Sequence, residues 1–149
     1  MKMMKTIKIL FILLFAVSSK MQAQVNEKSV IGVWESDKKD VRMEFFKDGA
    51  NYAAKLLWGN LVVEKDGITS KKDSKNPDVK LRARNILGIV SLTGLEWNGK
   101  EYINGKIYDP PSGDTYICKA WIEDGKLHLR GYLGISLLGK TVTWHRYKS

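Results

Sequence analysis

Tight-turn signals spaced along the chain constrain its fold more than any other sequence feature. Aspartate or asparagine precedes glycine at Asp48-Gly49, Asp66-Gly67, Asn98-Gly99 and Asp124-Gly125. Such pairs tolerate the positive φ angles of two-residue β-hairpin turns. Between them lie short segments in which apolar and polar residues alternate, such as residues 41–45. Alternation with a period of two is typical of half-buried strands, so the chain is predicted to be built from antiparallel hairpins.

The strand-like segments number about eight, and most are joined by tight turns. They are residues 30–35, 41–45, 51–63, 86–93, 101–108, 115–123, 126–132 and 140–147. Consecutive hairpins give an up-and-down order, and a closed barrel leaves no strand edge exposed. The predicted fold is therefore all-β, a single small antiparallel β-barrel of about eight strands. A two-sheet sandwich is the alternative.

One short helix is predicted inside the barrel sequence, after the polar interruption of residues 64–76. It begins at Asn76-Pro77-Asp78, where Asn76 can cap the helix, Pro77 suits its first turn and Asp78 complements its positive end. Arg82 and Arg84 follow near its other end, where cations are favoured. The helix is expected to span roughly two turns.

The N-terminus differs in character from the rest of the chain. Lys2, Lys5 and Lys8 precede an apolar run at residues 9–17, and no acidic residue occurs before Glu27. A basic start with a short apolar core is typical of a secretory signal peptide. The run is too short for the ~20 residues that span a bilayer. We therefore predict a signal peptide at residues 1–23 and a barrel domain at residues 24–149.

Cleavage after Ala23, with cleavage after Ser18 as the alternative, removes four lysines from a chain of formal charge +9. The remaining charge is weak support for a nucleic-acid partner, and none is predicted. Cys118 is the only cysteine, so neither an intramolecular disulfide nor a lipid anchor is expected. Its alternation with apolar neighbours predicts that its thiol is buried. The mature protein is predicted to be periplasmic or secreted, without a transmembrane segment.

Three ordered motifs follow the signal and are more specific than the strand pattern. They are Asp73 with Asn76-Pro77-Asp78, Leu81-Arg82, Arg84 and Leu87-Gly88; residues 105–110 with Gly113 and Thr115-Tyr116; and residues 129–132 with Gly134-Ile135-Ser136, Gly139 and Thr143-Trp144. Together they resemble the DUF2147 family of exported bacterial proteins, whose activity is uncharacterised. Many members carry a cysteine pair around the hairpin that is residues 46–55 here. This chain has none, so a function that needs that pair is not expected.

A weaker resemblance concerns architecture. Gly32, Val33 and Trp34 on the first predicted strand and Arg146 on the last are similar to a pattern of lipocalins and fatty-acid-binding proteins. In those barrels an arginine packs across a tryptophan and closes one end, which fits the attraction of a cation for an indole face. The resemblance implies that Trp34, Trp144 and Arg146 close the barrel. The alternative is that Trp34 is an ordinary core residue and Arg146 lies on the surface.

The titratable residues do not form a recognisable reaction signature. His128 and His145 are predicted to face outwards, and neither has the spacing of a metal site or a nucleophilic triad. Two aspartate pairs remain, Asp73 with Asp78 and Asp109 with Asp114. Either pair could hold a hard cation, but aspartates at such places more often cap a turn or helix. No catalytic residue, metal or cofactor is predicted.

Two sets of residues are candidates for binding. A basic cluster consists of Lys71, Lys72, Lys75, Lys80, Arg82 and Arg84, which could contact anionic lipid or polymer or could be a solvated face. The family resemblance implies a polar rim made of residues that fall in its motifs, Asn76, Asp78, Arg82, Tyr108, Asp109 and Tyr132, with Arg146 as a further candidate.

The sequence favours non-catalytic binding of a small amphipathic ligand or an envelope component at the barrel mouth. The alternatives are a hydrolase acting on cell-envelope material and a structural or stress-related module that binds another protein. A deep apolar cavity would favour ligand binding. Two close carboxylates, or a carboxylate beside His128, would favour the hydrolase. An exposed aromatic patch would favour the protein-binding module. We expect a mostly filled interior with a shallow mouth, because eight strands leave little room.

Overall fold

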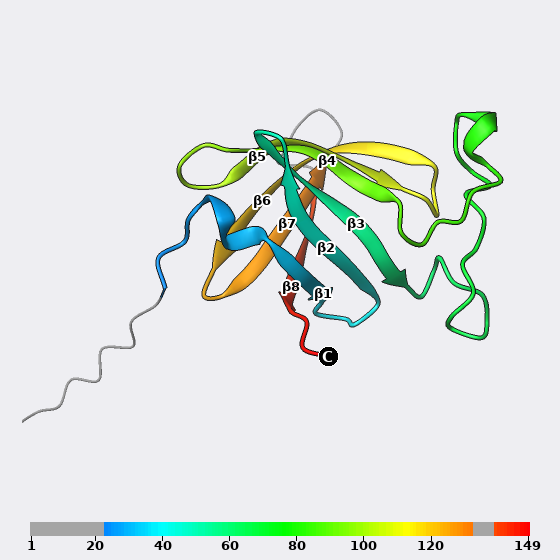
Figure 1. Ribbon diagram of the computed structural model, residues 1–149, viewed down its shortest axis with the longest axis horizontal. Coiled ribbons are helices and arrows are strands. Elements are labelled where there is room, and N and C mark those ends of the chain that lie inside the picture. Colours follow the sequence, from blue (N-terminus) through cyan, green and yellow to red (C-terminus); the bar gives the residue numbers. More distant parts are fainter. Residues whose placement is uncertain (1–22, 133–138) are drawn as a thin grey trace, which may run out of the picture.

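The computed structural model describes residues 23–132 and 139–149. Eight antiparallel strands form a closed barrel in which each strand pairs with the next and β8 returns to β1 (Figure 1). They are β1 Gly32–Ser36, β2 Val41–Asp48, β3 Asn51–Gly59, β4 Val90–Trp97, β5 Tyr102–Asp109, β6 Asp114–Glu123, β7 Lys126–Tyr132 and β8 Lys140–Arg146. The prediction of a single up-and-down β-barrel is confirmed, and the two-sheet alternative is wrong.

Helical structure in the described residues is limited to two 3-10 turns, η1 Glu27–Val30 before β1 and η2 Val79–Leu81 between β3 and β4. The prediction of a two-turn helix capped by Asn76 is therefore wrong in length and in cap. Asp78 is the N-cap, and its side chain accepts a hydrogen bond from the backbone N–H of Lys80 at 3.0 Å. None of the η2 residues is buried, so a longer helix would have no apolar face to pack against the barrel.

The boundaries of β3 and β4 also differ from the prediction. β3 ends at Gly59 and β4 begins at Val90, so residues 60–89 form one long loop. Val62, Val63 and Ile86 lie in this loop and are buried. Because these residues are apolar, the sequence predicts that they extend the flanking strands. In the structure they lie outside the strands and are buried within the loop.

A bulge in β5 changes which of its residues face the interior. Asn104 has a φ angle of +60°, and the register with β6 shifts between Tyr102 and Gly105. Tyr102 is consequently fully buried and packs edge-on against Tyr52, with ring centroids 5.4 Å apart. Strict alternation, which predicts that Ile103 faces inwards with Gly105, therefore fails at this bulge.

The N-terminal turn η1 covers one end of the barrel, which we call the closed end. The Tyr102 hydroxyl donates to the carbonyl oxygen of Glu27 at 2.8 Å and accepts from the N–H of Val30 at 3.1 Å. The indole Nε1 of Trp34 donates to the carbonyl oxygen of Val30 at 2.8 Å. These bonds connect β1, β5 and η1, so the chain entering the barrel is fixed to its interior.

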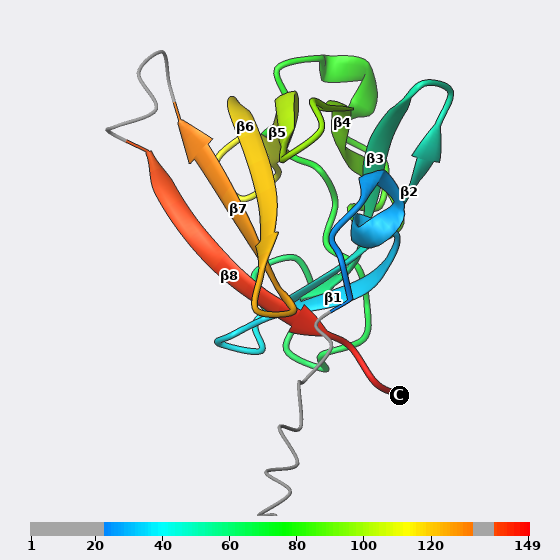
Figure 2. The same cartoon turned by 90° about the vertical axis from the view of Figure 1, so that its left-hand side faces the viewer.

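β8 ends beside β1 (Figure 2), and its last residue, Arg146, is paired with Trp34 at the closed end. Its Cζ atom is 4.1 Å from the ring centroid of Trp34. The guanidinium donates to the carbonyl oxygen of Ile31 at 2.5 Å and also to that of Ser29. One side chain thus stacks on Trp34 and binds two backbone acceptors of the covering segment.

Large side chains fill the barrel towards the closed end. The fully buried side chains of the interior include Trp34, Phe45, Tyr52, Leu92, Leu95, Tyr102, Cys118 and Leu127. The prediction that Cys118 is buried is confirmed, and burial raises the pKa of its thiol to about 12. Within the described ranges, the chain has no helix long and apolar enough to cross a membrane. Apart from Ala23, the predicted signal peptide lies outside the described residues.

Candidate functional site

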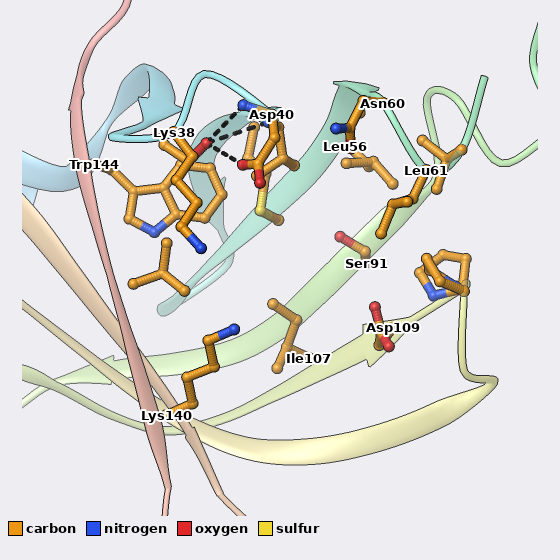
Figure 3. Close-up of a pocket in the computed structure, with 18 of the residues that line it drawn as sticks. Lys38, Asp40, Leu56, Asn60, Leu61, Ser91, Ile107, Asp109, Lys140 and Trp144 are labelled. Carbon is orange, nitrogen blue, oxygen red and sulfur yellow. Dashed lines mark hydrogen bonds between the residues drawn. The ribbon is translucent and has the colours of Figure 1, made fainter. Parts of the chain in front are cut away.

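A cavity of about 600 Å³ lies at the end of the barrel opposite η1, which we call the open end (Figure 3). Its inner wall is mainly apolar and is formed by Val41, Met43, Leu56, Ile107, Val142 and Trp144. Polar side chains at its mouth include Lys38, Asp40, Asn60, Ser91, Asp109 and Lys140. The volume falls within the range of small-molecule sites. The expectation of a mostly filled interior therefore holds only for the half next to the closed end.

The turn between β1 and β2 forms one side of the mouth and is held by a buried serine. The Ser36 hydroxyl donates to the Asp40 carboxylate at 2.5 Å and accepts from the N–H groups of Asp40 and Val41 at 3.1 and 3.2 Å. Ser36 is only 2% exposed, so these bonds are shielded from water. Lys38 projects from the turn that they fix.

Trp144 forms part of the inner wall and is 3% exposed. Its indole Nε1 is buried and has no hydrogen-bond partner among the described residues. Buried indole N–H groups usually have a partner, and one that lacks it costs about 1–3 kcal/mol. The sequence implies only that Trp144 fills the core and closes the barrel; in the structure the residue also lines the cavity, while its N–H group is buried.

Lys38 and Lys140 provide the positive charge at the mouth. Figure 3 shows their side chains extending into the cavity region from the β1–β2 turn and from the start of β8. The ion pairs found between described residues do not involve either lysine. Sequence analysis missed both residues. Lys140 could have been found from its phase, because it shares the inward face of β8 with Val142 and Trp144.

Beside the cavity lies a buried polar group that we call the Asp73 cluster, made of Asp73, Asn76, Arg84 and Tyr108. The Asp73 carboxylate is fully buried and accepts from the Tyr108 hydroxyl at 2.6 Å, Asn76 Nδ2 at 2.8 Å and Arg84 Nε at 2.9 Å. These contacts join the 60–89 loop to β5. They also give the buried carboxylate its hydrogen-bond donors from within the protein.

The Asp73 cluster shifts the pKa values of two of its members. Desolvation is the largest influence on Asp73 and raises its pKa, but the three hydrogen bonds and the charge of Arg84 together outweigh it. The pKa of Asp73 is therefore held below its ordinary value. Burial raises the pKa of Tyr108 to about 12, with a further contribution from its hydrogen bond to Asp73 and from the negative charge there.

The residues of the predicted polar rim separate into three places. Asn76, Arg82 and Tyr108 come together, because Arg82 Nε donates to the carbonyl oxygen of Asn76 at 2.8 Å and both Asn76 and Tyr108 bind Asp73. Asp78 lies next to them and donates its N–H to Asn76 Oδ1 at 2.8 Å. Tyr108 and Asp109 both line the cavity, whereas Tyr132 is not among the described residues that do so.

Gly113, in the β5–β6 turn, allows the 60–89 loop to approach closely. It has a φ of +77°, and a Cβ atom placed there would lie 2.2 Å from the carbonyl oxygen of Lys75. Gly113→Ala should lower the free energy of unfolding by about 1–3 kcal/mol more than Gly49→Ala, measured by urea denaturation. Gly49 is a matched control, because its φ is +60° and a Cβ there would meet no atom within 4 Å. Equal losses would show that the loop does not need this contact.

The histidines lie away from the cavity wall. His128 stacks on Trp121, with ring centroids 5.2 Å apart, and shares a hydrogen bond with Thr143 at 3.1 Å. His145 pairs with Asp37. Across residues 23–132 and 139–149, no group of three histidine, cysteine, aspartate or glutamate side chains is placed to hold a metal ion.

Comparison with solved structures finds the same fold elsewhere. Protein HP1028 from Helicobacter pylori, which is described as belonging to the lipocalin family, matches with a TM-score of 0.70 and 29% identity. The match covers 80% of this chain and 83% of the Helicobacter protein. Among curated protein sequences, none matches this chain.

A family described as uncharacterised proteins conserved in bacteria, DUF2147, matches residues 32–146. The matched region runs from the first residue of β1 to the last residue of β8 and so contains the whole barrel. The predicted resemblance to this family is confirmed. The chain belongs to the DUF2147 family of bacterial proteins, and its barrel is lipocalin-like.

Proposed function

We propose that this protein reversibly binds a small amphipathic molecule, with the apolar part of the ligand inside the open end of the barrel. The observation that carries this proposal is the cavity of about 600 Å³, which has an apolar inner wall and a polar mouth. Cavities of this size and lining are typical of small-molecule sites. The lipocalin description of the Helicobacter protein supports the proposal by analogy of fold alone.

The two alternative functions have less support. A hydrolase would need a titratable group that can exchange a proton with a bound substrate. The Asp40 and Asp109 carboxylates at the mouth each accept a hydrogen bond from a serine hydroxyl, from Ser36 at 2.5 Å and from Ser112 at 2.6 Å.

A protein-binding module would be favoured by a broad exposed aromatic patch. The large apolar residues exposed on the described surface are aliphatic: Ile31, Leu57, Leu61, Ile68, Val79, Leu81, Val90 and Ile117.

Binding can be tested with N-phenyl-1-naphthylamine, a neutral apolar probe that fluoresces when it leaves water. The wild-type protein should bind it saturably with one probe per chain. Val142→Trp, which fills the cavity from its inner wall, should weaken binding at least about tenfold, equivalent to 1.4 kcal/mol. Ile117→Trp is the matched control, because Ile117 is 43% exposed on β6 and does not line the described cavity wall.

Native mass spectrometry of the protein recovered from bacterial cells adds a second measurement. It should show a bound small molecule on the wild type and a reduced fraction bound on Val142→Trp. The same spectrum tests our proposal that the protein is exported, since loss of residues 1–23 changes the intact mass. Absence of both a bound molecule and saturable probe binding would refute the proposed function.

A further inference from the structure

We infer that the ligand carries an anionic head group, a carboxylate, sulfonate or phosphate, held at the cavity mouth by the ammonium groups of Lys38 and Lys140. This inference rests on the proposed function and gives the ligand a chemical class, that of an amphipathic anion. The apolar body of the ligand lies against the inner wall, and its charge stays at the mouth, where water can reach it.

The placement of the two lysines follows from the strands that carry them. Lys140 is the first residue of β8 and has the same phase as Val142 and Trp144, which form the inner wall. Its aliphatic stem can therefore extend along apolar surface while the ammonium group stays at the mouth. Lys38 reaches the same mouth from the turn fixed by Ser36 (Figure 3). Two elements far apart in the sequence thus supply two cations to one opening.

The acidic groups at the mouth already have partners in the folded protein. Asp37 pairs with His145, Asp40 accepts from Ser36, and Asp109 accepts from Ser112 at 2.6 Å. A hydrogen bond to serine does not neutralise a carboxylate, so the mouth as a whole is not strongly positive. Preference for an anion must arise from direct contact with the ammonium groups and should weaken at high salt.

Hydrogen-bond chemistry points to the same kind of head group. Lysine ammonium groups donate hydrogen bonds and do not accept them, so the matching head group is an acceptor. The oxygens of a carboxylate, sulfonate or phosphate have that chemistry. The indole N–H of Trp144, which is unpaired among the described residues, adds nothing to this preference, because the nitrogen itself is buried.

The experiment compares two probes that share an apolar body. N-phenyl-1-naphthylamine is neutral, and 1-anilinonaphthalene-8-sulfonate adds one sulfonate to the same ring system. Both are titrated into the wild type, Lys38→Gln, Lys140→Gln and the double variant. Lys126→Gln is the control, because Lys126 is an exposed lysine at the start of β7, near the closed end. Thermal melts confirm that each variant is folded.

Each single substitution should weaken binding of the sulfonate probe by about 3- to 10-fold, and the double variant by about tenfold or more, at low salt. The neutral probe should change by less than about twofold. Lys126→Gln should leave both affinities unchanged. If the neutral probe binds but the double variant leaves the sulfonate probe unaffected, the head-group inference is wrong and the proposed function stands. If neither probe binds saturably and native mass spectrometry shows no bound molecule, the proposed function fails and this inference fails with it.

Discussion

Replacing Asp73 with alanine is expected to lower the free energy of unfolding by about 3–4 kcal/mol. The substitution removes the acceptor of three hydrogen bonds, from Tyr108, Asn76 and Arg84. Arg84 is 36% exposed in its side chain and can be solvated by water, whereas the Asn76 side chain is left largely buried. Urea denaturation followed by tryptophan fluorescence measures the loss.

Hydrogen exchange shows where the Asp73→Ala variant loosens. Because the Asp73 cluster joins the 60–89 loop to β5, amides of that loop should exchange faster while those of β6 and β7 keep their protection. Asp66→Ala is the control, since Asp66 lies in the same loop and accepts from Thr69 and Ile68 but is exposed. Asp66→Ala should lower the free energy of unfolding clearly less than Asp73→Ala does. Equal losses for the two variants would contradict a special role for the cluster.

The contribution of Asp73 should also depend on pH. Its pKa in the folded protein is below the ordinary aspartate value, so the unfolded chain takes up the proton first as the pH falls below about 4. The unfolded state then binds more protons than the folded state, and stability falls with falling pH. The difference in free energy of unfolding between the wild type and Asp73→Ala should be constant near neutral pH and become smaller in acid. A difference that does not change with pH would contradict the low pKa.

Arg146→Ala is expected to lower the free energy of unfolding by about 2–3 kcal/mol. The substitution removes the cation from the Trp34 ring and leaves the carbonyl oxygens of Ile31 and Ser29 without this donor. Arg146→Lys should recover only part of the loss, because an ammonium group cannot stack on the ring and serve two acceptors as a planar guanidinium does. Urea denaturation of the variants gives the comparison.

Arg42→Ala is the matched control for Arg146→Ala. Arg42 also stacks on aromatic rings, with its Cζ 4.3 Å from the Tyr147 centroid, and it pairs with Glu35 at 2.6 Å. It binds no covering segment, so its loss should be about 1 kcal/mol or less. A double-mutant cycle of Arg146→Ala with Trp34→Phe should give a coupling of about 0.5–2 kcal/mol. A coupling near zero would mean that Arg146 does not close the barrel through Trp34.

Much of the fold can be predicted from the sequence because tight turns and strand alternation are local properties. The Asp-Gly and Asn-Gly pairs at Gly49, Gly99 and Gly125 lie in turns where these glycines have positive φ. Asn104-Gly105 is a further Asn-Gly pair, and Asn104 has a positive φ, but the pair lies inside a strand and forms a bulge. The pair alone does not distinguish a bulge from a hairpin turn. The burial of Val62 and Ile86 depends on the loop folding back onto the barrel, which the sequence does not reveal.

The candidate site is harder to predict, because its parts are distant in the sequence. Tyr108 and Asp73 are separated by 35 positions, yet they share a hydrogen bond of 2.6 Å. The family motifs pointed to Asn76, Arg82 and Tyr108, and the structure shows these residues satisfying one another beside the cavity. Lys38 lies in a turn, where strand phase gives no direction for its side chain.

The five tryptophans of the chain allow a direct test of where a ligand binds. Each gives an indole N–H signal in a nitrogen-15 NMR spectrum, and N-phenyl-1-naphthylamine can be titrated against all of them. We predict that the Trp144 signal shifts on saturation, because Trp144 lines the cavity and an aromatic probe bound there changes the magnetic environment of its indole ring. The Trp34 signal should stay in place, since its N–H donates to Val30 at the closed end. A shift of Trp34 or Trp121 with an unchanged Trp144 would contradict a binding site inside the open end of the barrel.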